Sequence, residues 1–298
     1  QPYDVYATAA DFGLSSNGTA EAKSYFASDL CVSEDVAIGT DSTDSQVAEG
    51  AGTFNLETNT VVYAKNLYER LYPASTTKIL TAYIALKYCD DLDAMVTVSE
   101  NAVNQASDSS VCNLKAGDVI RLRDLLYGLM LRSGNDAAVA IAEYISGDVD
   151  SFAALMNQEA AAMGATRSHF VNPNGLPDEN HYTCVYDMYL IFSNAIKNDT
   201  FVSIIGTTSY DVTYTDASGE AVTHTWENTN QYLTGNATTP DGFQIVGGKT
   251  GTTGEAGYCL VLYSYNPSGQ PIISIVFKAD GKSNLYLLMN EMLQGFAI

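Results

Sequence analysis

The sequence predicts an α+β protein in which one antiparallel sheet is covered by helices and carries an inserted, mainly helical lobe. Segments of strand character occur towards both ends of the chain, whereas the middle has apolar residues at three- and four-residue spacing. Strands from the two ends bury their apolar faces most economically in a single sheet. We therefore expect a sheet-containing lobe from residues 48–98 and 240–298, a mainly helical lobe from 99–239 with a β-hairpin near 210–226, and an N-terminal extension, 1–47, of unknown role.

The N-terminal part begins with a stretch rich in Ser, Thr, Asp, Ala and Gly, in which residues 20–30 favour a short helix. A hairpin is predicted next, with strands over 51–56 and 60–65 around the polar turn Glu57-Thr58-Asn59. The second of these strands is rich in β-branched residues, which suit a pleated surface.

The middle of the chain is predicted to be helical. Pro73 suits the position just ahead of a helix, and Ser75 could cap the helix that follows. Further along, Gly164 marks the end of a helix that Asp150 or Ser151 would cap. The predicted helices span 75–88, 122–131, 136–145, 150–163 and 187–196.

The last third returns to strand character. Segments 210–214 and 221–226 flank the turn Asp216-Ala217-Ser218-Gly219, which predicts a hairpin. Ser283 could cap a terminal helix that reaches Phe296. The other predicted strands span 244–249, 258–265 and 272–277.

The composition is that of a globular protein and argues against several classes of partner. Of 298 residues, 46% are hydrophobic and 16% charged, which is enough apolar material for a large core. A net charge of −21 argues against nucleic acid and against docking on anionic lipid, since few basic side chains remain to neutralise phosphates. No run of eighteen apolar residues occurs, so we expect no membrane segment in this chain.

The five cysteines are scattered and form no C-x-x-C pair, so neither a zinc site nor redox chemistry is expected, and we expect most of them to be buried as small apolar residues. No metal or other cofactor is predicted. The chain begins with Gln1 and has no apolar signal segment, which we interpret as a processed or trimmed product, and this fits a secreted protein.

Three short motifs carry the chemistry: Ser75-Thr76-Thr77-Lys78, Ser133-Gly134-Asn135 and Lys249-Thr250-Gly251. Alone, each has an ordinary structural explanation, namely a capped helix, a turn between helices or a glycine-rich strand end with a solvated lysine. Together and in this order they match the S-x-x-K, S-x-N and K-T-G set. They supply a nucleophile, a base, a proton relay and an anion anchor, which are the groups that an acyl-transfer site needs.

The spacing of Ser75 and Lys78 places them one helical turn apart on the same face. A serine hydroxyl is a poor nucleophile until a base takes its proton. Lys78 can act as that base only if its pKa falls towards neutrality, which burial and a neighbouring Lys249 would both favour. The N–H of Ser75 and a donor just after Lys-Thr-Gly could then form an oxyanion hole.

The other two motifs would complete the site. Ser133 would pass a proton between lysine and leaving group, and Asn135 would orient a substrate carbonyl or the lysine. Lys249 would attract a substrate carboxylate, helped by the hydroxyl of Thr250. Glycine at position 251 would leave room for a substrate lying along the strand edge.

From about Ala51 to the C-terminus the chain resembles serine-type D-alanyl-D-alanine carboxypeptidases, the low-molecular-mass penicillin-binding proteins. The resemblance implies a β-lactamase/transpeptidase-like fold, peptidoglycan stem peptides ending in D-Ala-D-Ala as substrates, and β-lactam antibiotics as covalent inhibitors. It rests on the strings Pro73-Ala74-Ser75-Thr76-Thr77-Lys78, Leu131-Arg132-Ser133-Gly134-Asn135-Asp136-Ala137, Phe170-Val171-Asn172-Pro173-Asn174-Gly175-Leu176-Pro177 and Gly248-Lys249-Thr250-Gly251-Thr252-Thr253.

The resemblance also implies a role for each site residue. Ser75 would be the acyl-ester nucleophile, Lys78 the proton acceptor and Ser133 the relay. Lys249 would hold the terminal carboxylate, and the N–H of Thr252 would complete the oxyanion hole. An enzyme of this kind works outside the cytoplasm, at the outer face of the bacterial cytoplasmic membrane or as a secreted protein. The sequence stops at Ile298, before the β-rich domain and membrane anchor that many relatives carry, so membrane attachment stays open.

Two other functions stay open. A class A-like β-lactamase shares the motifs but needs a glutamate that positions the deacylating water, and the comparable loop, 172–181, contains Glu179. A non-catalytic wall-binding or sensor module would keep the pocket without turnover, but the complete set of reactive side chains argues against it. A Ser-His-Asp hydrolase is less favoured, because no G-x-S-x-G motif occurs and His169, His181 and His224 are interpreted as core or loop residues.

Overall fold

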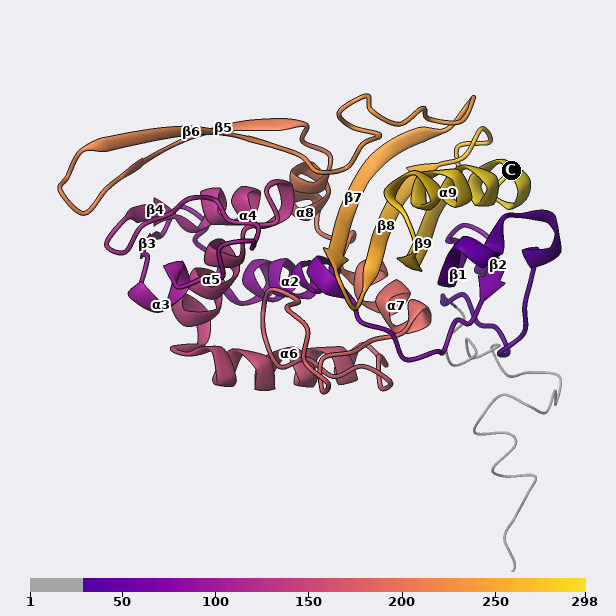
Figure 1. Cartoon of the computed structure of the whole chain (residues 1–298), viewed down its shortest axis with the longest axis horizontal. Coiled ribbons are helices and arrows are strands. Elements are labelled where there is room, and N and C mark those ends of the chain that lie inside the picture. The colour runs from indigo at the N-terminus through magenta and orange to yellow at the C-terminus, as the bar shows by residue number, and fades with distance from the viewer. Residues whose placement is uncertain (1–28) are drawn as a thin grey trace, which may run out of the picture.

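The computed structural model describes residues 29–298 and contains a five-stranded antiparallel sheet with the strand order β2-β1-β9-β8-β7 (Figure 1). The N-terminal strands pair with the C-terminal ones through β1 and β9, where Ala51 lies opposite Val276. This confirms the predicted sheet built from both ends of the chain. The strands are β1 (Ala48–Asn55), β2 (Thr60–Lys65), β7 (Gln244–Thr253), β8 (Gly257–Tyr265) and β9 (Pro271–Ala279).

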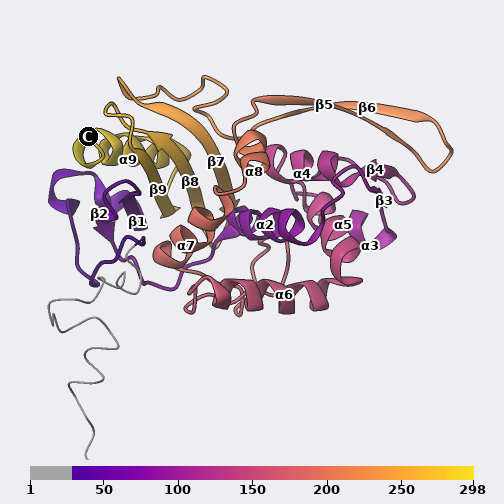
Figure 2. The ribbon, with the colours of Figure 1, turned by 180° about the vertical axis from the view of Figure 1, so that it is seen from behind.

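Helices cover both faces of this sheet, because its strands place apolar residues alternately in two cores. In β8, Leu260 and Leu262 belong to the core beneath α9 (Lys282–Phe296), whereas Val261 belongs to the larger core that also includes α7 (Val185–Ala195). Figure 1 shows α9 across one face of the sheet, and Figure 2, seen from behind, shows α7 on the other.

A group of helices packs beside the sheet around α2 (Lys78–Tyr88), which contacts α4, α5, α6 and α7. This helix is apolar on nearly all sides, as a helix enclosed by others must be. The helices predicted over 122–131, 136–145 and 150–163 are confirmed, whereas two short helices that show no readable periodicity were not predicted. The bounds are α3 (Glu100–Val103), α4 (Leu122–Leu131), α5 (Asn135–Ser146), α6 (Val149–Ala162) and α8 (Asp199–Ile205).

The hairpin predicted near 210–226 is confirmed, but it belongs to a second sheet that the sequence did not predict. This sheet has the order β3-β4-β5-β6, and two of its strands are only three residues long, too short to show alternation. The hairpin reaches over α4 (Figure 1), where Tyr210 stacks on Tyr127 with ring centroids 3.7 Å apart. The strands are β3 (Met95–Thr97), β4 (Val119–Arg121), β5 (Ser209–Thr215) and β6 (Ala221–Glu227).

The predicted caps of the helices α6 and α9 are wrong. The carboxylate of Asp148 accepts the N–H of Ser151 at 2.7 Å and caps α6, rather than Asp150 or Ser151. Several polar residues adjoin this helix start, and the one that takes the extended backbone of a cap is selected by packing. The terminal helix follows Gly281 and has no side-chain cap, so Ser283 does not have the predicted role.

The short helix predicted over 20–30 falls almost entirely before residue 29, outside the described residues. In the described part of the predicted N-terminal extension, Ile38 exchanges backbone hydrogen bonds of 2.8 and 3.1 Å with Ala64 of β2. These bonds join the extension to the sheet. The boundaries of the two lobes, 48–98 with 240–298 and 99–239, stay a prediction. Although α7 lies within the second range, it packs on β1 and β9.

All five cysteines lie in the described part of the chain and are free thiols, and four of them are buried, in line with the expectation for most of them. Within residues 29–298, no helix combines the length and apolarity needed to cross a membrane.

Candidate active site

Ser75 lies in a 3-10 helix formed by residues 74–77 next to β7, and not in the first turn of α2 as predicted, so it caps nothing. Residues three apart eclipse one another in a 3-10 helix. The expected proximity is therefore present, and Ser75 Oγ lies 2.9 Å from Lys78 Nζ. The turn is tightly enclosed, because a Cβ at Gly175 would lie 1.8 Å from the carbonyl oxygen of Ala74.

Lys78 has no exposed surface, and three oxygen atoms surround its side-chain nitrogen. The nitrogen lies 2.9 Å from Ser75 Oγ, 2.8 Å from Asn135 Oδ1 and 2.6 Å from the carbonyl oxygen of Asn174. Burial, and next the positive charge of Lys249, lower the pKa of Lys78 well below its ordinary value. A neutral amine has two N–H groups and one lone pair. Because the two asparagine oxygens accept the N–H groups, the lone pair is left for the hydroxyl of Ser75.

The turn between α4 and α5 presents Ser133 and Asn135. Ser133 has a φ of 58°, a left-handed conformation that non-glycine residues rarely adopt and that often occurs at functional sites. Behind the turn, the buried carboxylate of Asp136 accepts the N–H groups of Cys112 at 2.9 Å and Leu114 at 3.1 Å. These bonds join the turn to the neighbouring loop.

Lys249 is only 1% exposed, so it is not the solvated lysine that is common at the end of a strand. Its Nζ donates to Ser133 Oγ at 3.0 Å and to the carbonyl oxygen of Thr250 at 2.8 Å. Burial lowers the pKa of Lys249 to about 7. As an ammonium group, it keeps one N–H for an incoming anion.

Gly251 lies against the turn that carries Ser75. A Cβ at this position would lie 3.0 Å from the Ser75 nitrogen and 3.1 Å from the Ala74 Cβ. The glycine therefore permits β7 to approach Ser75 closely, which is a different reason from the room for substrate that the sequence indicated. Next to it, Thr252 is exposed, and its hydroxyl donates to the Gly251 carbonyl at 2.8 Å.

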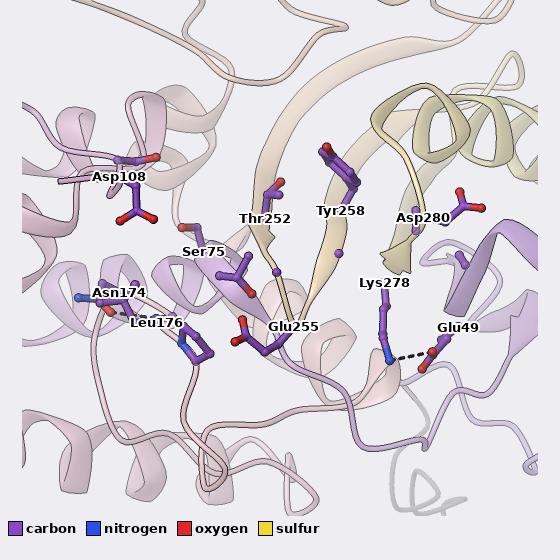
Figure 3. A pocket seen from close by; sticks show the side chains of 18 of the residues that line it. Glu49, Ser75, Asp108, Asn174, Leu176, Thr252, Glu255, Tyr258, Lys278 and Asp280 are labelled. Atoms are coloured by element: carbon purple, nitrogen blue, oxygen red, sulfur yellow. Dashed lines mark hydrogen bonds and ion pairs between the residues drawn. The ribbon is translucent and has the colours of Figure 1, made fainter. Parts of the chain in front are cut away.

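A cavity of about 960 Å³ opens in front of these residues (Figure 3). Ser75 and Thr252 lie next to each other on its wall, and Asn174 enters from the loop that follows α6. A smaller hollow of about 150 Å³ continues past Ser75 to Ser133 and Thr250. The fold thus brings all eight residues predicted for the site to one place, around two connected hollows with Ser75 at their junction.

Three residues near the site were missed by the sequence analysis. Asn174 contributes a backbone carbonyl, and no side-chain pattern can indicate such a group. Lys282 is an exposed residue at the start of α9 that lines the smaller hollow, and it belongs to none of the three motifs. His181 is fully buried beside the 3-10 turn and was interpreted only as a core or loop histidine.

Comparison with known proteins places this geometry in a family. Residues 39–281 match the family model described as D-alanyl-D-alanine carboxypeptidase. The chain belongs to the D-alanyl-D-alanine carboxypeptidase family. The resemblance expected from the sequence motifs is thereby confirmed.

Family members of known identity support the same assignment. The chain is 34% identical over 251 residues to the D-alanyl-D-alanine carboxypeptidase DacF of Bacillus subtilis, and 34% identical over 265 residues to a D-alanyl-D-alanine carboxypeptidase of a Streptomyces strain. These matches cover 83% and 84% of this chain. The chain spans 61% of the Bacillus protein and 88% of the Streptomyces protein.

Solved structures in the family share the fold. A Streptomyces DD-transpeptidase superimposes with a TM-score of 0.78 at 33% identity, covering 85% of this chain and 98% of that one. The carboxypeptidase DacD of Francisella tularensis gives a TM-score of 0.73 at 29% identity, covering 89% and 72%. The predicted fold class is therefore confirmed.

Proposed function

We propose that this protein is a serine D-Ala-D-Ala carboxypeptidase that removes the terminal D-Ala from peptidoglycan stem peptides through an acyl-enzyme on Ser75. The observation that carries the proposal is the 2.9 Å contact between Ser75 Oγ and the buried Lys78 Nζ. The other contacts of Lys78 leave its lone pair for the serine, which is the arrangement that general-base activation requires. An extracytoplasmic location and acylation by β-lactams are parts of the same proposal.

In the acylation step, Lys78 takes the proton of Ser75 while Oγ attacks the carbonyl carbon of the penultimate D-Ala. The N–H groups of Ser75 and Thr252 would stabilise the resulting oxyanion. When the C–N bond breaks, the proton held by Lys78 passes through the hydroxyl of Ser133 to the leaving nitrogen, and Lys78 is neutral again. In deacylation, Lys78 takes a proton from water while the water oxygen attacks the ester carbon, and it returns this proton to Ser75 Oγ when the C–O bond breaks.

Lys249 has two roles in this scheme. Its N–H holds the Ser133 hydroxyl at 3.0 Å, which orients the proton relay. Thr250, the next residue along β7, lines the smaller hollow, where the remaining N–H of Lys249 would bind the terminal carboxylate. Lys282 lines the same hollow and adds a second positive charge that would attract this carboxylate.

The kcat/KM for a D-Ala-D-Ala peptide is expected to be bell-shaped in pH. The rate rises with pH because Lys78 acts as a base only after losing its proton, and its pKa lies well below the ordinary value. It falls above about pH 7 because Lys249 then loses the charge that attracts the carboxylate. Initial rates of D-Ala release at low substrate concentration measure this profile. A rate that stays constant far above neutral pH would contradict the role of Lys249.

The β-lactamase alternative needs a water-positioning carboxylate from the loop 172–181, in which only Asp178 and Glu179 are acidic. Asp178 and Glu179 are both exposed, and the backbone carbonyl of Glu179 accepts a hydrogen bond from Arg70. After peptide acylation, the free D-Ala leaves and admits water, whereas after penicillin acylation the tethered ring obstructs it. The penicilloyl ester should therefore persist while the peptide ester turns over.

We expect the Glu179→Ala variant to behave as the wild type in both reactions, because this exposed side chain does not take part in deacylation. The measurements are D-Ala release from diacetyl-Lys-D-Ala-D-Ala and decay of the penicilloyl adduct followed by intact mass. Rapid penicillin hydrolysis that disappears in Glu179→Ala would favour the β-lactamase. Stable acylation without any release of D-Ala would favour the sensor module.

A further inference from the structure

One of the two oxygens that orient Lys78 belongs to a backbone, so its position depends on how the loop 171–176 is held. The Asn174 carbonyl lies 2.6 Å from Lys78 Nζ. Inside the loop, Asn172 Oδ1 accepts the Gly175 N–H at 2.7 Å, and Asn172 Nδ2 donates to the Leu176 carbonyl at 3.0 Å. These bonds fix the shape of the loop, but its placement against α2 needs contacts between the two segments.

Two side-chain contacts besides the Lys78 bond connect the loop with the segment that carries the nucleophile and base. Thr81 Oγ1, on α2, donates to the Pro173 carbonyl at 2.7 Å. The imidazole of His181 forms the second contact, with Nε2 at 2.8 Å from Thr77 Oγ1 and Nδ1 at 3.1 Å from the Val171 nitrogen. His181 thus joins the residue before Lys78 to the first residue of the loop.

The partners of His181 determine its tautomer. The Val171 N–H can only donate, so Nδ1 accepts and carries no proton. In a neutral ring the proton then lies on Nε2, which donates to Thr77 Oγ1. Burial lowers the pKa of His181 to about 4; the charge of Asp178 acts against this shift, and those of His169 and Lys78 add to it. The ring is therefore neutral wherever the enzyme would work, and both bonds persist.

We propose that His181 is a positioning residue that holds the loop 171–176 against the 77–81 segment, so that the Asn174 carbonyl stays on Lys78. His181 touches neither substrate nor the reacting atoms in this scheme. It acts through the hydrogen bond that helps direct the lone pair of Lys78 towards Ser75. The proposal rests on the proposed function, because it presupposes that Lys78 is the base.

The test is the rate of acylation by penicillin in two pairs of variants. His181→Phe removes both bonds while keeping a flat ring, and we expect the acylation rate constant to fall roughly tenfold, as for the loss of one buried hydrogen-bonded contact. The apparent dissociation constant of the initial complex should not change. His181→Gln, whose amide can accept and donate, should restore most of the rate. Thr77→Val should slow acylation in the same way, and Thr77→Ser should not.

The pH profile separates positioning from a general loosening of the fold. The Asn174 carbonyl stabilises the ammonium form of Lys78, so its displacement should shift the rising limb of the acylation rate to lower pH while the maximal rate falls. A loosened fold would instead reduce the amount of active protein and leave the limb in place. His224→Phe, on β6 away from the site, is the matched control and should acylate as the wild type.

Several outcomes would overturn the proposal. His181→Phe could react at the wild-type rate with the wild-type pH profile, or His181→Gln could be as slow as His181→Phe. If His181→Phe does not fold, Thr77→Val carries the test, and a wild-type rate there overturns the proposal. A wild-type protein that forms no penicilloyl adduct would refute the proposed function itself, which is a different result from altered rates in the variants.

Discussion

Replacement of Ser75 by alanine is expected to abolish covalent modification by penicillin. The wild-type protein should gain the mass of one penicillin molecule, because the ring-opened antibiotic stays attached to the serine and its tethered leaving group blocks water. Without Oγ there is no atom to form the ester, so the effect of Ser75→Ala is a complete loss rather than a reduced rate. Intact mass after saturating exposure, followed by peptide mapping, locates the adduct.

Ser203→Ala is the control for this experiment, because it removes an exposed hydroxyl on α8 away from the cavity. It should acylate as the wild type. An adduct on any peptide other than the one containing Ser75, or no adduct on the wild-type protein, would refute the assignment of the nucleophile.

The Lys78→Ala variant is expected to acylate about a hundred- to ten-thousandfold more slowly than the wild type, the range that a general base contributes. The loss arises because no other described group lies within hydrogen-bonding distance of Ser75 Oγ to take its proton. Asn135 and Asn174 would also lose the side chain that they orient. Time courses of penicilloyl formation at several penicillin concentrations measure the rate constant.

Lys249→Ala should fail differently from Lys78→Ala. Loss of the carboxylate anchor should raise KM for the peptide, and loss of the Ser133 contact should lower kcat to a smaller extent. Lys197→Ala, which removes an exposed lysine after α7, is the matched control and should leave both unchanged. Acylation of Lys78→Ala at the wild-type rate would show that another group is the base.

The strands and long helices could be predicted from sequence because their signals are local. The run over 122–131 has the apolar periodicity of a helix, and the two strands flanking Asp216–Gly219 show a hairpin signal that needs no tertiary context. The elements that were missed, such as β3 and α8, are short. Their conformation is imposed by neighbours, since so few residues cannot form a stable helix or strand alone.

The start of α2 illustrates where local rules gave the wrong detail. Pro73 and Ser75 are typical of a helix start, yet residues 74–77 form a tighter turn enclosed by Gly175 and Gly251. The predicted contact between Ser75 and Lys78 nevertheless exists, because a spacing of three residues brings the two side chains together in either kind of helix.

The family and the side chains proposed as nucleophile, base and relay could be identified from the sequence alone, because the types and spacing of these residues are visible in the chain. The features that would make these groups reactive depend on the tertiary structure. The burial of Lys78 and Lys249, the backbone carbonyl of Asn174 and the position of His181 all depend on segments far apart in sequence. A pKa is lowered by the loss of water around a charge, and that loss exists only once distant segments have packed together.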